Sequence, residues 1–357
     1  MKERQQKILL TGGGTGGSVT PLLAIVDELR SAEPYLPIDF LWLGTNFGIE
    51  KAMVDDAQIR FMSIPSGKFR RYFSLRNFID PFFVFAGLIK SFIVILGWRP
   101  DIIVSAGSFV AVPVVWAGWL CRVPSLIHQQ DVISGLANKL CAPFARTVTV
   151  TFEKSINDFG KKAVWTGNPI RQQFAYRDPE IRVGQVRNYP ILLVLGGGTG
   201  SEKMNRLVFD SLPGLVAFCR VIHVVGPGKA SYLRDANYEQ HEFLAADDMA
   251  KVYSAADLVV SRAGMSVLTE LSYLGKPAII IPLPESHQEA NASAFHEARA
   301  AIILNQVELT PGVFVNIVKK AFQDDKLLNE LGINVRKMIR KGAGKTIVNE
   351  LTKILNK

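Results

Sequence analysis

The chain has 357 residues, of which 48% are hydrophobic and 20% are charged. This ordinary globular composition excludes wholesale disorder, collagen-like repeats and a coiled-coil rod, and the length predicts two domains that each bury a core. The net charge of +9 suits anionic lipid, phosphate-rich substrates or nucleic acid as partners. Three scattered cysteines without a CxxC pair indicate neither a disulfide framework nor a zinc site, so a reducing cytoplasm fits best.

Short apolar runs alternate with helix-length segments along the whole chain. The charged first residues run directly into the first of these runs, so no signal peptide is expected. Short strands separated by helices are typical of parallel, doubly wound sheets covered on both faces. The predicted strands are 8–10, 40–43, 102–104, 125–127, 147–150, 191–195, 221–225, 258–260 and 278–281.

Residues 60–99 combine seven basic residues and one acid with two apolar, aromatic-rich runs, 82–89 and 91–98. Lys90 separates the two runs, and neither approaches the roughly 20 apolar residues that a membrane span needs. The alternatives are a buried helix and a basic, aromatic helix lying on an anionic bilayer surface, and we favour the second. A nucleic-acid partner is not expected, because no helix-turn-helix, RRM or KH pattern lies nearby.

The chain contains an internal sequence repeat that divides it into two halves. The segment ILLTGGGTGG at 8–17 recurs as LVLGGGTGS at 193–201, and each copy is an apolar run, a glycine-rich turn and a helix-forming stretch. Two copies half a chain apart predict two similar α/β domains, 1–165 and 166–340, with a hinge near 166–169. The remaining segment, 341–357, is predicted to be a helix that closes the second domain or packs back on the first.

The glycine turns fit close approach of backbone N–H groups to phosphate oxygens at a helix N-terminus. Gly12, Gly14 and Gly17 match the dinucleotide fingerprint, but the second predicted strand ends in Gly44-Thr45-Asn46 without the carboxylate that an NAD ribose needs. A P-loop also fails, because Ser18 and Val19 follow in place of Lys and Ser/Thr. A tight turn without a ligand remains possible for one loop and is much less favoured for two.

Two further clusters follow predicted strands in the second half. In the first, Arg262 and Gly264 precede a helix start with Ser266, and Glu270 lies one helical turn on, where it could accept both ribose hydroxyls. In the second, His287, Gln288 and Asn291 fall in the first turn of a helix, and amide side chains suit several sugar hydroxyls. No DxD motif exists to hold a nucleotide sugar through a metal, so backbone N–H groups and arginine must stabilise a leaving diphosphate.

Together these motifs resemble the MurG family within glycosyltransferase family 28. Each motif is weak alone, and eight in the right order are highly specific. They are TGGGTGG at 11–17, GKFRRYFSLRNF at 67–78, AGSFVAVP at 106–113, HQQDVISGLAN at 128–138, GNPIR at 167–171, LGGGTGSEKMN at 195–205, RAGMSVLTE at 262–270 and HQEANA at 287–292. The resemblance implies an α/β GT-B fold, in which two Rossmann-like doubly wound parallel-sheet domains have the active site in the cleft between them.

The resemblance also implies an inverting transfer of N-acetylglucosamine from UDP-N-acetylglucosamine to an undecaprenyl-diphosphate-linked muramyl-pentapeptide, without a metal or other cofactor. The second domain would bind most of the donor: backbone near Ala246 and Met265 the uracil, Glu270 the ribose, Arg262 and the 196–201 turn the diphosphate. The implied donor-binding residues are Thr15, Gly16, Gly17, Arg171, Gly198, Thr199, Ala246, Arg262, Met265, Glu270, His287, Gln288 and Asn291.

The first domain would bind the acceptor and the membrane in this interpretation. Gly13, Gly14, Thr15 and Ser18 would hold the acceptor diphosphate. A membrane-facing set, resting peripherally on the cytoplasmic face of the bacterial membrane, would comprise Arg70, Arg71, Arg76, Phe82, Phe83 and Phe85.

This chain departs from the family pattern mainly on the acceptor side. Ser18 stands where the family usually has His, and Gln129 where it has Glu, with a carboxylate two positions later at Asp131. Gly198 and Thr199 replace Ser and Gln, and Ala111 replaces Ser. The candidate bases that take the acceptor proton are therefore Asp131 and His128.

Three other classes stay open from the sequence. One is a UDP-sugar transferase with another lipid or small-molecule acceptor, which a panel of donors and acceptors would separate. A second is a UDP-sugar-binding relative without catalysis, which predicts tight binding and no turnover. An NAD oxidoreductase is the least favoured, since the ribose carboxylate is missing.

Overall fold

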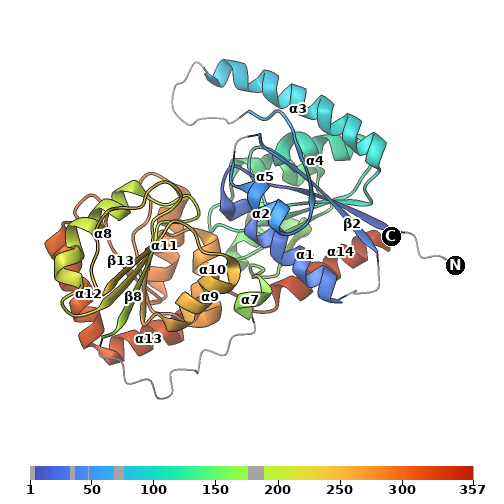
Figure 1. The fold of residues 1–357 in the computed structure, drawn as a ribbon. Helices are drawn as coiled ribbons and strands as arrows, with labels where there is room; N and C mark the ends of the chain where they lie inside the picture. The colour runs from blue at the N-terminus through green and yellow to red at the C-terminus, as the bar shows by residue number, and fades with distance from the viewer. Residues whose placement is uncertain (1–4, 33–36, 47, 68–75, 176–188, 357) are drawn as a thin grey trace. The chain divides into compact units, whose positions relative to one another are not determined.

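The computed structural model describes residues 5–32, 37–46, 48–67, 76–175 and 189–356, without the side chains of 76–79 and 175. The chain forms two compact units. Unit 1 comprises residues 1–171 and 340–357, and unit 2 comprises residues 172–339. Each unit is an α/β domain around one parallel sheet (Figure 1).

Unit 1 contains a seven-stranded sheet in the order β3-β2-β1-β4-β5-β6-β7, and every described pairing in it is parallel. Because β2 and β4 lie on opposite sides of β1, the strand order reverses between β1 and β4, and ligands bind at such switch points in open α/β sheets. The strands are β1 (Gln6–Thr11), β2 (Ile38–Gly44), β3 (Arg60–Ser63), β4 (Ile102–Ser105), β5 (Ser125–Gln129), β6 (Thr147–Val150) and β7 (Ala163–Trp165).

Helices cover both faces of this sheet, as its continuous apolar strands require. One face packs on α1 and α14, and the other packs on α3 and α4 (Figure 1). The helices of unit 1 are α1 (Thr20–Ala32), α2 (Glu50–Asp56), α3 (Arg76–Trp98), α4 (Ala111–Leu120), α5 (Leu136–Cys141), α6 (Ile156–Phe159) and α14 (Ala343–Leu355), with a 3-10 turn η1 (Gly16–Ser18) before α1.

Unit 2 repeats this plan with a six-stranded parallel sheet in the order β10-β9-β8-β11-β12-β13, whose switch point lies between β8 and β11. Its strands are β8 (Ile191–Leu195), β9 (Arg220–Val224), β10 (Tyr238–His241), β11 (Leu258–Ser261), β12 (Ala278–Ile280) and β13 (Ile302–Ile303). Its helices are α7 (Gln172–Ala175), α8 (Glu202–Leu215), α9 (Ala246–Ala255), α10 (Met265–Leu274), α11 (His287–Glu297), α12 (Pro311–Gln323) and α13 (Asp325–Val335). Figure 1 shows α8 and α12 on one face of the sheet and α9 and α10 on the other.

The boundary between the units differs from the expected 165/166. Segment 166–171 belongs to unit 1, because Thr166 donates its N–H to the Val150 carbonyl at 3.0 Å and Asn168 is buried against His128. The chain then returns to unit 1 at Arg340, whose guanidinium donates to the Trp165 carbonyl at 2.8 Å. In α14, Ile347, Val348 and Leu351 join the core beneath α1.

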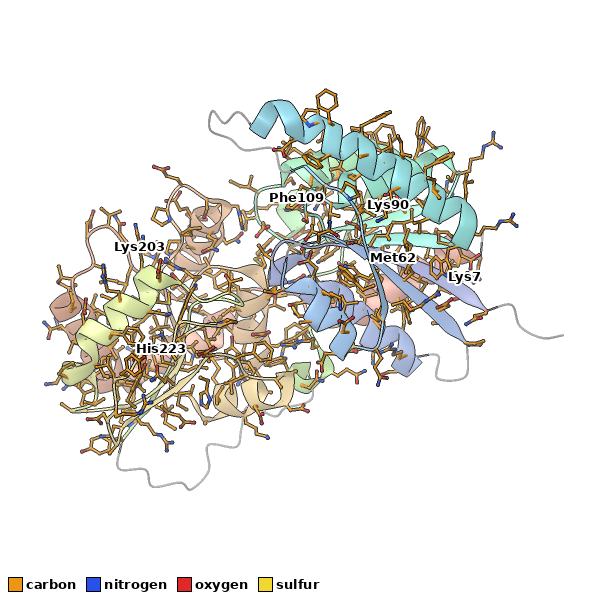
Figure 2. All side chains as sticks on the ribbon, turned by 45° about the horizontal axis from the view of Figure 1, so that its top comes forward. Lys7, Met62, Lys90, Phe109, Lys203 and His223 are labelled. Atoms are coloured by element: carbon orange, nitrogen blue, oxygen red, sulfur yellow. The ribbon has the colours of Figure 1, made fainter. Side chains whose placement is uncertain are left out.

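Helix α3 runs unbroken through Lys90, which Figure 2 labels, so the two apolar runs lie on one helix. Its portion Asp80–Trp98 is long and apolar enough to cross a membrane by length and composition alone, with a mean hydropathy of 1.9. One stripe of the helix is instead packed on unit 1: Gly87, Ser91 and Ile95 are buried at four-residue spacing. A Cβ on Gly87 would lie 2.2 Å from the Pro65 carbonyl oxygen, so only glycine permits this close approach.

Candidate active site

In unit 1, the loops after β1 and β4 meet at the switch point. Ser108 donates its hydroxyl hydrogen to the Gly13 carbonyl at 2.7 Å, although the backbone of Ser108 has φ +78°. A non-glycine residue with such a positive φ is strained, and strain of this kind gathers at functional sites. Nothing local to AGSFVAVP predicts this cross-loop bond, so Ser108 is a candidate site residue that the sequence alone does not reveal.

Ser18 closes the glycine turn from inside. Its buried hydroxyl accepts the N–H of Gly13 at 3.1 Å and lies 3.2 Å from the Gly13 carbonyl oxygen. Gly14 has φ +79° and donates its N–H to the Glu50 carboxylate at 3.1 Å. The N–H groups of Gly13 and Gly14 are therefore already bonded within the protein. Of the residues expected at the acceptor diphosphate, Thr15 is the exposed one, and Gly16 and Gly17 beside it are half-buried.

His128 lies fully buried at the end of β5, where its Nδ1 is 2.9 Å from the Thr149 hydroxyl and its Nε2 is 2.7 Å from Asn168 Oδ1. Both ring nitrogens have partners inside unit 1. Burial lowers the pKa of His128 to about 4, while the bond to Asn168 opposes this shift. The geometry argues against His128 as the base and favours a role in fixing the 166–171 segment.

Gln129, which stands where the family has Glu, and Asp131, the carboxylate two positions later, lie in different environments. Gln129 is buried, donates from Nε2 to the carbonyls of Asp131 at 2.8 Å and Ile133 at 3.3 Å, and accepts from Asn138 at 2.7 Å. A glutamate there could not donate these bonds. Asp131 itself is half-buried in the loop that follows β5, at the same sheet edge as the glycine turn.

Arg171 ends the GNPIR segment within unit 1. It lies close enough to Asp27 of α1 to oppose the rise that burial causes in the pKa of that carboxyl group.

In unit 2, Arg262 ties three loops together at the switch point. Its guanidinium donates to the Ser201 hydroxyl at 2.8 Å, to Gln306 Oε1 at 2.5 Å, and to the carbonyls of Ile281 at 3.0 Å and Pro282 at 3.2 Å. The side chain is buried, and burial lowers the pKa of the guanidinium, which stays protonated at neutral pH. Arg262 thus supplies positive charge beneath the 196–201 turn and fixes that turn, while both of its Nη atoms are bonded inside unit 2.

Around Arg262, the turn and the start of α10 present backbone donors. Gly198 and Thr199 are exposed at the tip of the turn, and Ser201 caps α8 by accepting from Met204 N at 3.5 Å. Helix α10 begins at Met265 after Gly264. Its first N–H groups lack an intrahelical partner, as at the start of every helix, and no side chain caps them. The Ser266 hydroxyl is buried without a hydrogen-bond partner among the described residues. Ser266 is therefore a further candidate ligand contact, beyond the donor-binding residues that the family resemblance implies.

The remaining expected donor residues differ in accessibility. Glu270 is buried on α10, one helical turn after Ser266. Asn291 is fully buried and donates to the Ala263 carbonyl at 3.1 Å, so it holds α11 against the start of α10. His287 is exposed, and Gln288 is half-buried with Oε1 accepting from Leu283 N at 3.0 Å. Ala246 is the first residue of α9.

Two models of glycosyltransferase family 28 match the chain: its N-terminal domain over residues 8–150 and its C-terminal domain over residues 191–347. The chain belongs to glycosyltransferase family 28. Within the family, it is 36% identical over 325 residues to the UDP-N-acetylglucosamine–N-acetylmuramyl-(pentapeptide) pyrophosphoryl-undecaprenol N-acetylglucosamine transferase of Clostridium kluyveri, covering 88% of this chain and 91% of that one. A Bacillus thuringiensis protein with the same name followed by the number 3 is 34% identical over 357 residues. That match covers 97% of this chain and 99% of the Bacillus thuringiensis protein.

Solved structures agree on the fold. The crystal structure of Acinetobacter baumannii MurG matches this family 28 chain with a TM-score of 0.74 at 24% identity, covering 98% of this chain and 99% of that one. The glycotransferase of kitacinnamycin matches with a TM-score of 0.72 at 15% identity, covering 99% of each chain. At these identities the likeness concerns the two-domain GT-B fold, as the sequence analysis predicted.

A lower pH is expected to destabilise this family 28 protein through its buried histidines, His128 in unit 1 and His223 in unit 2 (labelled in Figure 2). Burial lowers the pKa of His223 to about 3 and that of His128 to about 4, both below the ordinary value. The unfolded chain therefore takes up protons first, so stability is full above about pH 6.5 and falls as the pH drops toward the folded pKa values. Between about pH 7.5 and 5, each histidine is expected to cost about 2 kcal/mol.

Urea unfolding at these two pH values measures this loss, with the two units followed separately. The variant His223→Gln should lose most of the pH dependence of unit 2 and leave that of unit 1 intact. An unchanged pH dependence of unit 2 in His223→Gln would show that carboxylates, and not this histidine, set it.

Replacing Arg262 with lysine is expected to lower the stability of unit 2 by about 2–3 kcal/mol, because one ammonium group cannot satisfy four fixed acceptors. The Kd for UDP-N-acetylglucosamine should rise about tenfold, since the Ser201 hydroxyl and the turn lose their tether. Thermal unfolding and calorimetric titration measure the two effects. Arg206→Lys on the exposed face of α8 is the matched control and should change neither.

Proposed function

We propose that this protein transfers N-acetylglucosamine from UDP-N-acetylglucosamine to an undecaprenyl-diphosphate-linked muramyl-pentapeptide in peptidoglycan synthesis. The observation that carries the proposal is the near full-length similarity, 34–38% identity, to family 28 members that bear this activity in their names. The switch point of unit 2 supports it, because a glycine turn, a buried arginine and an uncapped helix start converge where a nucleoside diphosphate would bind.

Unit 2 binds the donor in this proposal. The uncapped N–H groups of α10 and the Ser266 hydroxyl donate hydrogen bonds to the diphosphate oxygens, and the charge of Arg262 stabilises the leaving UDP. Glu270 accepts the ribose hydroxyls, and the first turn of α11, with His287 and Gln288, contacts the sugar. Asn291 positions that turn through its bond to Ala263.

The reaction is a direct displacement. The acceptor hydroxyl oxygen attacks the anomeric carbon, the bond from that carbon to the diphosphate oxygen breaks, and its electron pair leaves with UDP, so the anomeric configuration inverts. Asp131 takes the hydroxyl proton as the new bond forms. The proposed reaction needs no metal, because backbone N–H groups and Arg262 stabilise the negative charge that develops on the diphosphate.

In this proposal unit 1 rests on the cytoplasmic face of the membrane, because the acceptor is linked to a membrane lipid. The face of α3 opposite its packed stripe exposes Phe82, Phe85 and Ile93, with Phe82 75% exposed. A face of this kind inserts aromatic rings at the level of the headgroups. The basic residues Arg70 and Arg71, expected to meet anionic headgroups, lie outside the described residues, as does the side chain of Arg76.

The experiment is UDP release from UDP-N-acetylglucosamine with and without a muramyl-pentapeptide diphosphoryl-lipid analogue, in the presence of a metal chelator. Acceptor-dependent release in the chelator supports both the transfer and its independence of metal. Release only after metal is restored would overturn the metal-free step. Donor binding without release would instead indicate another acceptor or a binding-only relative.

A further inference from the structure

A buried carboxylate that the proposed reaction does not use lies beneath the glycine turn of unit 1. Glu50 is the first residue of α2 and is fully buried. Its Oε2 accepts the N–H of Gly14 at 3.1 Å, and its Oε1 accepts the N–H of Thr45 at 3.0 Å and also the Thr45 hydroxyl. Glu50 therefore fastens the turn after β1 to the turn after β2.

Two glycines make room for this carboxylate. A Cβ on Gly13 would lie 2.5 Å from Glu50 Oε1, and a Cβ on Gly48 would lie 1.8 Å from Oε2. Both distances are too short for any side chain, so glycine at 13 and 48 is needed for Glu50 to adopt this position. The turns after β1 and β2 therefore each have a glycine where a side chain would overlap the Glu50 carboxylate.

Three donors converge on Glu50, and only an ionised carboxylate accepts all of them without presenting a hydrogen of its own. The carboxylate of Glu50 also accepts the N–H of Gly14, at the end of the turn nearer β1. A phosphate oxygen could otherwise bind that N–H group. With the N–H of Gly13 bonded to Ser18, the N–H groups left for an anion in this turn are those from Thr15 to Gly17.

We propose that Glu50 is a positioning residue for the acceptor diphosphate. Its carboxylate excludes phosphate from the inner end of the glycine turn and holds the outer end, Thr15 to Gly17, in the conformation that binds the diphosphate. This inference rests on the proposed function, since it concerns the acceptor of that reaction. It predicts a selective effect on acceptor binding, because the donor contacts proposed for Arg262, Ser266 and Glu270 belong to unit 2.

The test is Glu50→Gln, which keeps the volume and turns one acceptor atom into a donor that faces an N–H group. The KM for the lipid-linked acceptor analogue is expected to rise tenfold or more, with kcat changed less than threefold and the Kd for UDP-N-acetylglucosamine unchanged. Asp55→Asn, on the exposed side of the same helix, removes the same charge and should leave all three values as in the wild type.

Gly48→Ala gives an independent readout that leaves the carboxylate chemistry intact. The added methyl displaces Glu50 from the turn, and the same selective rise in acceptor KM is expected even if Glu50→Gln does not fold. An unchanged acceptor KM in either variant, or an equal loss of donor affinity, overturns the positioning role. Wild-type protein that shows no acceptor-dependent release would overturn the proposed function as well, whereas normal wild-type turnover with an unaffected Glu50→Gln overturns this inference alone.

Discussion

Asp131→Asn is expected to lower kcat for acceptor-dependent UDP release by about 10²–10⁴-fold, the range that a positioned general base contributes. The amide keeps the shape of the side chain and cannot take the proton of the acceptor hydroxyl. The Kd for UDP-N-acetylglucosamine and the melting temperature should stay as in the wild type, because the Asp131 main-chain carbonyl keeps its bond from Gln129. Steady-state kinetics with calorimetric titration of the donor make the measurement.

The double variant Gln129→Glu/Asp131→Asn tests whether the carboxylate can sit two positions earlier. We expect no recovery of kcat, because residue 129 is 2% exposed and its amide is needed as a donor to the Asp131 and Ile133 carbonyls. Recovery to wild-type turnover would show that residue 129 reaches the acceptor hydroxyl. A turnover of Asp131→Asn equal to that of the wild type would remove Asp131 as the base.

The triple variant Phe82→Ser/Phe85→Ser/Ile93→Ser is expected to weaken binding to phosphatidylglycerol vesicles by about 10³-fold or more. Burying each large apolar side chain contributes about 1.5–3 kcal/mol, and all three lie on the exposed face of α3. Vesicle sedimentation across lipid concentrations measures the partition. Donor binding by unit 2 should not change.

The matched control replaces three exposed apolar residues of unit 2, Tyr232, Val313 and Ile333, with serine. Their loss removes comparable apolar surface away from α3 and should leave vesicle binding intact. If the α3 variant still sediments like the wild type, then α3 is not the membrane contact. If the unit 2 control also fails to bind, then the apolar surface is used non-specifically.

Local pattern was enough to predict most of the sheet. Nine predicted strands correspond to β1, β2, β4, β5, β6, β8, β9, β11 and β12, because most of them are continuous apolar runs. The four strands that were not predicted, β3, β7, β10 and β13, are short and lie at the edges of the two sheets. Strand β3 (Arg60–Ser63) has no buried residue and is stabilised by its pairing with β2, so its sequence carries no strong strand pattern.

The candidate site shows the same division. The glycine turns, the RAGMSVLTE segment and the repeat of 8–17 at 193–201 are local patterns, and they determined from the sequence alone that the chain has two nucleotide-binding-type domains and resembles family 28. Partners of individual side chains depend on residues far away in the chain. Ser108 and Gly13 are 95 positions apart, and Arg262 and Ser201 are 61 apart.

The sequence thus predicted which turns could approach phosphate oxygens, because turn conformation is set by neighbouring residues. Only the tertiary structure decided which groups in those turns stay available: it buried His128 and Asn291, used Gln129 to hold a loop, and placed Glu50 beneath the glycine turn. A polar side chain that loses water must find hydrogen-bond partners, and folding brings those partners from distant strands and loops.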